Sequence, residues 1–356
     1  MFMSLGLLVA GVPRVNEEAS RYAAWLAASF VCYALVYGLG VMVHGGSFRE
    51  MDKPIRFVVA AIVVLVAVRV PLRASWLIAL LVAAAGAALG YAVYDRLVNN
   101  EARVGMFVNP IQFGVMAVVV SLMCVVLLMG LPARWARYKP WLWIGTAAAL
   151  LAGMLSGSLT ATLAVLSLPF LVFFVWGRGR LRRSAVVVSL LALMTIVGVT
   201  GARVSMADRI TSNTARLENF SSAWGLFLSS PLIGVGRDRF IKLREAERAS
   251  GSLSAYASSF NVAHNEYLDA LAKRGLLGIS GVLALFLIPG WLFASLMRTR
   301  RGSERAWAGA GLAATAAFAL ASLTQNVITH GSGSNMLAGT LVVCLCLALQ
   351  RPTEGS

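Results

Sequence analysis

Histidine is the side chain best suited to move a proton near neutral pH, and the chain has three, His44, His264 and His330. An unperturbed histidine has a pKa of about 6.5, so its neutral form is available as a general base. His264 begins the segment HNEYLDALAKRGLLG, whose apolar spacing predicts a helix running toward Gly275. A position in the first helical turn favours the neutral imidazole, which makes His264 the preferred base. His330 is the alternative base, and we interpret His44, which precedes two glycines, as a loop residue.

The composition indicates a membrane protein. Of 356 residues, 59% are hydrophobic and 13% are charged, whereas about a quarter of a soluble domain is charged. Uncharged runs such as Phe107–Met129 and Leu276–Met297 are long enough to cross a bilayer, which takes roughly 20 residues. Because a helix satisfies its own backbone hydrogen bonds inside a bilayer, we expect an all-α, polytopic integral membrane protein.

The chain is strongly basic, with 31 Lys and Arg against 15 Asp and Glu, a net charge of +16. Membrane proteins concentrate such an excess in cytoplasmic loops, and no soluble module is present, so we do not expect nucleic-acid binding. The four cysteines all lie within apolar runs and indicate no disulfide framework. Three histidines far apart in the sequence and the absence of a D-x-D pair favour chemistry without a metal.

The apolar runs predict ten membrane spans and a short helix at residues 2–12. The spans lie near residues 22–43, 55–70, 75–94, 107–129, 141–156, 159–176, 184–201, 276–297, 306–328 and 334–349. Three arginine-rich clusters then fall on one side of the membrane, which the positive-inside rule assigns to the cytoplasm. We therefore expect N-terminal transmembrane helices over residues 1–201, a periplasmic loop with short interfacial helices over 202–275, and C-terminal transmembrane helices over 276–356.

The external segment contains the turns that must position His264. Apolar residues recur at helical spacing and predict an interfacial helix: Leu217, Phe220, Trp224, Phe227 and Leu228. Pro231 is expected to end this helix, and Gly234 and Gly236 to form a turn. We expect Asn261 to cap the next helix and Gly275 and Gly278 to mark a break before the following span.

These motifs resemble the O-antigen ligase and polymerase family. The resemblance rests on the segment HNEYLDALAKRGLLG and on PLIGVGRDRF upstream of it. It extends to Arg216, to DKPIRF at 52–57 and to EARVGMFVNPIQFG at 101–114, and so covers most of the chain. The family commonly has twelve spans, so we expect about ten to twelve. Many relatives carry an S-x-S-R sequence where this chain has Leu159 in place of the arginine.

The resemblance implies a glycosyltransferase of the bacterial inner membrane with an active site facing the periplasm. The implied donor is an undecaprenyl-pyrophosphate-linked glycan and the implied acceptor is a sugar hydroxyl of lipid A–core, with membrane lipids around the protein and no metal or other cofactor. His264 would take the proton of the acceptor hydroxyl, which attacks the anomeric carbon with inversion. Arginine forks suit the pyrophosphate oxygens. The catalytic candidates are therefore His264 and Arg216, and the substrate-binding candidates are Arg103, Arg56, Arg237, Arg239 and Asn265.

Several alternatives stay open at the level of the sequence. The same base and arginines serve an O-antigen or exopolysaccharide polymerase that joins lipid-linked repeat units. A transporter of lipid-linked glycans is a hypothesis of another class, although no internal repeat is visible. Arg216 alternatively anchors its helix at lipid headgroups. We interpret Glu266 and Asp269 as solvated helix residues.

Overall fold

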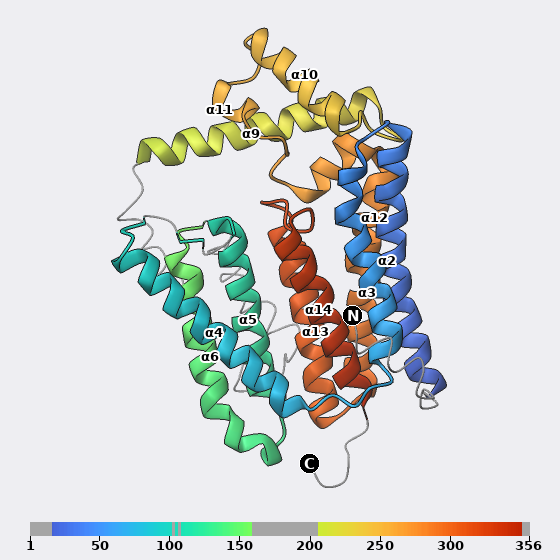
Figure 1. Ribbon diagram of the computed structural model, residues 1–356, viewed down its shortest axis with the longest axis vertical. Coiled ribbons are helices and arrows are strands. Elements are labelled where there is room, and N and C mark those ends of the chain that lie inside the picture. Colours follow the sequence, from blue (N-terminus) through green and yellow to red (C-terminus); the bar gives the residue numbers. More distant parts are fainter. Residues whose placement is uncertain (1–15, 102–103, 106–107, 159–205, 351–356) are drawn as a thin grey trace.

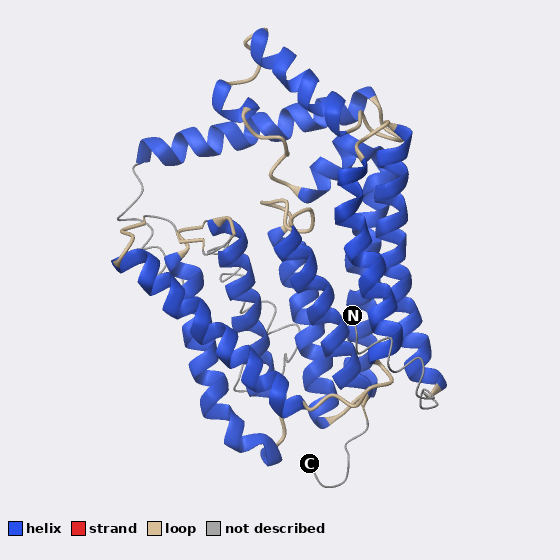
Figure 2. Ribbon diagram, viewed as in Figure 1, coloured by secondary structure: helices blue, strands red, loops and turns tan. Residues whose placement is uncertain are grey.

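The computed structural model describes residues 16–101, 104–105, 108–158 and 206–350. Helices make up the ordered elements of these residues, and no strand is present among them (Figure 2). The elements are α2 (Glu17–Val43), η1 (Phe48–Met51), α3 (Asp52–Ala67), α4 (Ala74–Leu97), α5 (Pro110–Gly130), η2 (Ala133–Tyr138), α6 (Lys139–Leu155), α9 (Met206–Ser229), α10 (Arg237–Ala249), α11 (Ala255–Ser258), α12 (Glu266–Thr299), α13 (Gly302–Ala321) and α14 (Gly331–Leu349).

Five of these helices, α2, α4, α5, α12 and α14, are long and apolar enough to cross a membrane. The predicted all-helical fold is therefore confirmed over the described residues, and these five helices agree with a membrane protein. The remaining predicted spans near α3, α6 and α13 are also helical. The runs at 2–12, 159–176 and 184–201 lie outside the described residues, so the total number of spans stays a prediction, as does the periplasmic side of segment 202–275.

The long helices form two adjoining groups under a helical cap (Figure 1). One group contains α4, α5 and α6, and the other contains α2, α3, α12, α13 and α14, with α5 packed against α13 between them. Alanines on α13 are buried against its neighbours, and a Cβ on Gly311 would overlap the ring of Phe293 on α12. Small residues let apolar helices approach closely, which is how membrane helices gain packing energy.

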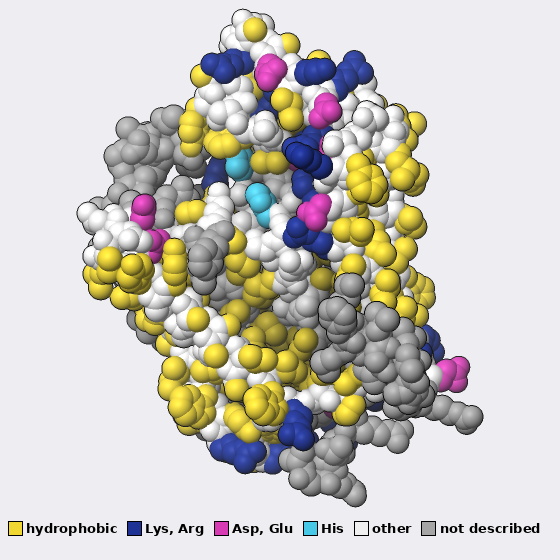
Figure 3. All heavy atoms as spheres, viewed as in Figure 1, with side chains coloured by type: hydrophobic (Ala, Val, Ile, Leu, Met, Phe, Trp, Pro, Cys, Tyr) yellow, Lys and Arg dark blue, Asp and Glu magenta, His cyan; other side chains and the backbone are white. Residues whose placement is uncertain are grey.

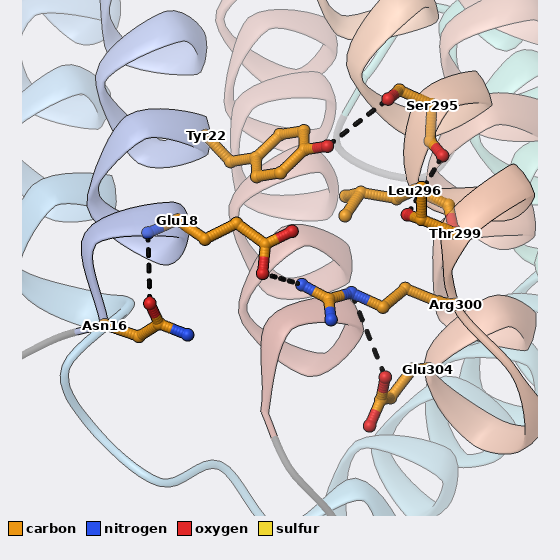
Figure 4. A network of polar contacts seen from close by, with 8 residues as sticks. All are labelled: Asn16, Glu18, Tyr22, Ser295, Leu296, Thr299, Arg300 and Glu304. Carbon is orange, nitrogen blue, oxygen red and sulfur yellow. Dashed lines mark hydrogen bonds and ion pairs between the residues drawn. The ribbon is translucent and has the colours of Figure 1, made fainter.

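The cap consists of α9, α10 and α11 and crosses one end of the two groups (Figure 1). An apolar cluster joins it to α12; its members include Ala223 and Leu226 from α9, Phe240 from α10, Ala263 from the loop before α12 and Ala272 from α12. At the opposite end of the molecule, Arg300 ties three elements together (Figure 4). Its guanidinium lies 2.8 Å from Glu18 of α2 and 3.9 Å from Glu304 of α13.

Helix α12 is broken at Gly275, which has φ 62° and ψ −154°. The segment 231–236 lies against this break and supplies hydrogen bonds to both of its sides. Backbone N–H groups of Val235 and Gly236 donate to the carbonyls of Ala272 and Lys273 at 2.9 and 3.0 Å. On the other side, Leu276 N–H donates to the Pro231 carbonyl at 2.8 Å. The predicted turn and the predicted break at Gly275 are therefore two halves of one junction, whereas Gly278 lies within the helix.

Two glycines make the junction possible. Gly234 has φ +70°, and a Cβ on it would overlap the backbone of Lys273 and Arg274. A Cβ on Gly275 would overlap the backbone of Leu232. Both positions combine a left-handed backbone with a close approach, which together require glycine.

We expect Gly275→Ala to destabilise the protein by about 2 kcal/mol or more, because it adds both left-handed strain and a backbone clash. The matched control is Gly290→Ala in the same helix, where a Cβ would meet nothing within 4 Å. The control should leave stability unchanged or raise it slightly through helix propensity. Thermal unfolding of the detergent-solubilised protein measures both effects, and equal melting temperatures for the two variants would contradict the junction's role.

Candidate active site

The candidate site lies where the first turn of α12 meets two loops, 259–265 before the helix and 322–330 between α13 and α14. Figure 3 shows two histidine side chains in a hollow below the cap, with Lys and Arg side chains beside them. Side chains at the start of the helix form hydrogen bonds to both loops. We call these contacts of Asn265, Glu266 and Asp269 the clamp.

Asn265 caps α12 and holds the second loop. Its Oδ1 accepts the N–H groups of Tyr267 and Leu268, each at 3.0 Å, and its Nδ2 donates to the Leu323 carbonyl at 2.9 Å. The prediction that Asn261 caps this helix is therefore wrong. The Asn261 carbonyl instead accepts a hydrogen bond from Lys273 Nζ at 2.9 Å.

Two carboxylates of the first turn continue the clamp. Glu266 Oε2 accepts the Ile328 N–H at 3.0 Å, which fixes the segment just before His330. Asp269 Oδ1 accepts the Ala263 N–H at 3.0 Å, which fixes the residue before His264. Glu266 is 0% and Asp269 is 2% exposed, so the interpretation of both as solvated residues is wrong. Their backbone partners come from loops that the helical pattern does not reveal.

His264 is held in an unusual backbone conformation with φ 54°, in the left-handed region. Such a conformation is costly for a residue other than glycine, and it is found where the surroundings impose it, often at functional sites. The clamp through Ala263 and Asn265 supplies that constraint. The Phe260 ring packs edge-on against the imidazole, with 4.4 Å between the ring centres.

The imidazole of His264 is oriented by Gln325. Nδ1 lies 2.7 Å from Gln325 Oε1, and a carbonyl oxygen can only accept, so Nδ1 carries the proton. Nε2 then has the free lone pair. It is buried, and no described residue makes a hydrogen bond to it. A general base requires such a nitrogen, whose lone pair is available to accept a proton from a substrate.

The electrostatic surroundings keep His264 neutral. Burial lowers its pKa below the usual 6.5, the Gln325 hydrogen bond partly offsets this, and the positive charge of Arg216 lowers the pKa further. Arg216 is half-buried in α9. The structure therefore brings the two catalytic candidates, His264 and Arg216, into one electrostatic environment.

His330 forms the opposite side of the same site. Burial lowers its pKa, and the positive charge of Lys53 and the neighbouring His264 lower it further. Arg56 lies next to it, because its guanidinium occupies the space that a Cβ on Gly331 would need. Arg56 also pairs with Asp52 at 2.6 Å.

The other sequence candidates have different positions. Arg237 and Arg239 line a separate pocket at the start of α10. Arg103 lies outside the described residues. Asn265 is a helix cap that positions the loops.

Sequence reasoning missed two buried residues, Arg244 and Gln325. Arg244 is 2% exposed, donates to Asn219 Oδ1 and to the Ala257 carbonyl, and contributes positive charge at His264. Its spacing of four residues from Phe240 places it on the buried stripe of α10, a signal that would have identified it. Gln325 lies 61 residues from His264, and no local pattern predicts that contact.

We expect Asp269→Asn to destabilise the protein by about 3–5 kcal/mol, because it leaves the Lys273 ammonium buried without its 2.7 Å partner. The double variant Asp269→Leu/Lys273→Met removes both charges and should recover part of this loss. Thermal unfolding of wild type and both variants tests the pair. A single variant as stable as wild type would show that the pair does not support the clamp.

Comparisons with known proteins relate part of the chain to one family. Residues 144–283 match the family model described as O-antigen ligase. An uncharacterized protein of Haemophilus influenzae is 21% identical over 328 residues, which cover 86% of this chain and 82% of that protein. The matched segment includes the cap, the junction at Gly275 and His264, whereas Gln325 and His330 follow it in the sequence. Over residues 144–283, this chain is therefore similar to the O-antigen ligase family.

Proposed function

We propose that the protein transfers a glycan from undecaprenyl pyrophosphate to a sugar hydroxyl of lipid A–core, with His264 as general base. The observation that carries this proposal is the buried, unpartnered Nε2 of an imidazole whose Nδ1 is fixed by Gln325. The O-antigen ligase family match supports the reaction class. We place the protein in the bacterial inner membrane, with this site facing the periplasm.

In the proposed reaction, Nε2 of His264 takes the proton of the acceptor hydroxyl. The acceptor oxygen forms a bond to the anomeric carbon while the bond from that carbon to the pyrophosphate oxygen breaks, and the configuration inverts. The lipid pyrophosphate leaves with the bonding electron pair. General-base assistance of this kind is worth roughly 10²–10⁴ in rate.

The charge that develops on the leaving pyrophosphate requires nearby cations. Arg216 is the first candidate, because its charge already acts on His264. Arg56, beside His330, and Arg103 are further candidates for donor binding. Guanidinium groups bind phosphate oxygens through two parallel hydrogen bonds and need no reorganisation during the reaction.

The proposed chemistry also bears on the alternatives. A polymerase that joins lipid-linked repeat units would use the same base and differs only in the acceptor. The similarity to the O-antigen ligase family favours group transfer over transport.

We expect His264→Ala to reduce glycan transfer by at least about 100-fold while donor binding is retained, because the variant lacks the base. Arg216→Ala should weaken donor binding as well. His330→Ala is the matched control, since it removes the second histidine of the site. The assay uses purified protein in EDTA, a polyprenyl-pyrophosphate glycan and lipid A–core, and product is separated on a gel.

Each outcome of this assay is informative. Full activity of His264→Ala together with loss of activity in His330→Ala would transfer the role of base to His330. Wild-type protein that lengthens only the lipid-linked glycan is a polymerase. Loss of all activity in EDTA that added metal restores would contradict a metal-independent reaction.

The pH dependence should follow the protonation of His264. Because the folded environment lowers its pKa, we expect the transfer rate to stay constant from pH 8 to about 6.5 and to fall only at lower pH, as the base becomes protonated. Gln325→Glu places a carboxylate beside the ring, which raises the pKa and moves the decline to higher pH. Single-turnover rates across this range measure the shift. An unchanged profile in Gln325→Glu would show that Gln325 does not act through His264.

A further inference from the structure

A second polar pocket lies at the junction that breaks α12. It has a volume of about 330 Å³ and is lined by the end of α2, Glu50 of η1, the segment 230–239 and residues 273–274 of α12. His264, Gln325 and His330 do not line it. The role of its lining residues must therefore be explained separately from that of His264 and its neighbours.

Positive charge predominates in this pocket. Arg237, Arg239, Lys273 and Arg274 face it, against Glu50 and Asp238. Lys273 is already paired with Asp269 at 2.7 Å. Arg237 approaches Glu50 only to 3.6 Å, which is longer than a hydrogen bond. The guanidinium groups of Arg237 and Arg239 are exposed and can bind an anion that enters.

Arg274 supplies the strongest indication that the pocket binds an anion. Its side chain is packed against Gly40 and Gly278, with the guanidinium carbon 4.2 Å from the centre of the Tyr37 ring. The residue is 7% exposed, yet its Nη2 has no hydrogen-bond partner among the described residues. A buried guanidinium nitrogen without a partner is costly, so an acceptor that enters the pocket would be bound with a large gain.

The backbone of the pocket adds donors. Helix α10 begins at Arg237, and its cap, Gly236, has no side chain to satisfy the first N–H groups. The first intrahelical bond runs from Phe240 N–H to the Gly236 carbonyl at 3.0 Å. The N–H groups of the preceding helical residues point out of the helix start, where the helix dipole also favours an anion.

Glu50 indicates what else the ligand must contain. Its carboxylate is 5% exposed and lines the pocket, and Oε1 has no hydrogen-bond donor among the described residues. A simple inorganic anion would be repelled by this group. A ligand that carries both hydroxyl groups and a negative charge would satisfy Glu50 and the arginines together.

We propose that this pocket binds an anionic sugar unit, one that bears a phosphate or a carboxylate, of the glycan substrate. The inference rests on the proposed function, because a glycan-transferring protein must hold sugar units beyond the reacting one. The volume is at the lower end of the range for ligand pockets, which suits a single sugar. Arg237, Arg239 and Arg274 bind the charged group, and Glu50 accepts hydrogen bonds from the sugar hydroxyls.

Binding of small probes tests the proposal without requiring transfer. Glucose 1-phosphate, glucuronic acid, glucose and inorganic phosphate are titrated into the purified full-length protein, and dissociation constants are measured by thermal shift. We expect the two anionic sugars to bind at least 10-fold more tightly than glucose and than phosphate. Arg237→Gln/Arg239→Gln should weaken their binding at least 10-fold. The matched control, Arg248→Gln, removes an exposed arginine at the other end of α10 and should bind like wild type.

The outcomes separate this inference from the proposed function. Inorganic phosphate that binds as tightly as glucose 1-phosphate would overturn the sugar site, and so would a double variant with wild-type affinity. Glu50→Gln should weaken the anionic sugars but not phosphate, and an equal effect on both would also overturn it. His264→Ala should bind the probes like wild type, so that transfer and probe binding can fail independently.

Discussion

The structure depends on how the break in α12 is satisfied. A helix that is interrupted inside an apolar protein leaves backbone N–H and C=O groups without partners. Each such buried group destabilises the fold by more than a typical hydrogen bond stabilises it. Here the segment 231–236 supplies those partners on both sides of Gly275. The cap is thereby bonded to the one helix that also carries the candidate site. Glycine at positions 234 and 275 allows the two backbones to approach closely enough.

The part of α12 before the break positions the two loops that carry His264 and His330. It is short, but its polar side chains point backward to the loops on either side. Asn265 and Glu266 hold the loop that follows α13, while Asp269 and Lys273 hold the loop that precedes α12. Buried charges are expensive in an apolar surrounding, and those of Glu266, Asp269 and Lys273 are tolerated here because each has a backbone or ionic partner. The result is a histidine whose strained backbone and ring orientation are both determined by neighbours.

The choice of glutamine as the partner of His264 has a chemical consequence. A carboxylate at position 325 would stabilise the protonated imidazole and raise its pKa. A neutral amide fixes the same tautomer without that effect, so the base stays unprotonated at neutral pH. The nearby cations act in the same direction. In the proposed reaction, a base that accepts a proton beside a leaving anion benefits from both features.

Much of this protein could be predicted from local sequence signals. Uncharged apolar runs determine the membrane class, because a bilayer requires about 20 such residues. Glycines and Pro231 mark the turn and the break, because few other residues tolerate those backbone angles. His264 is identifiable as a base candidate from its residue type and its place before an amphipathic helix.

Other features were decided only by tertiary contacts. The capping role of Asn265, the burial of Glu266 and Asp269, and the contact of Gln325 with His264 depend on loops distant in the sequence. The grouping of the arginines is of the same kind, since Arg216 acts at His264 whereas Arg237 lines another pocket. Sequence patterns indicate which face of a helix is apolar. They do not indicate whether a charged side chain in the first turn forms hydrogen bonds with water or with a neighbouring loop. Only the packing of the cap and the two helix groups determines which of these it meets.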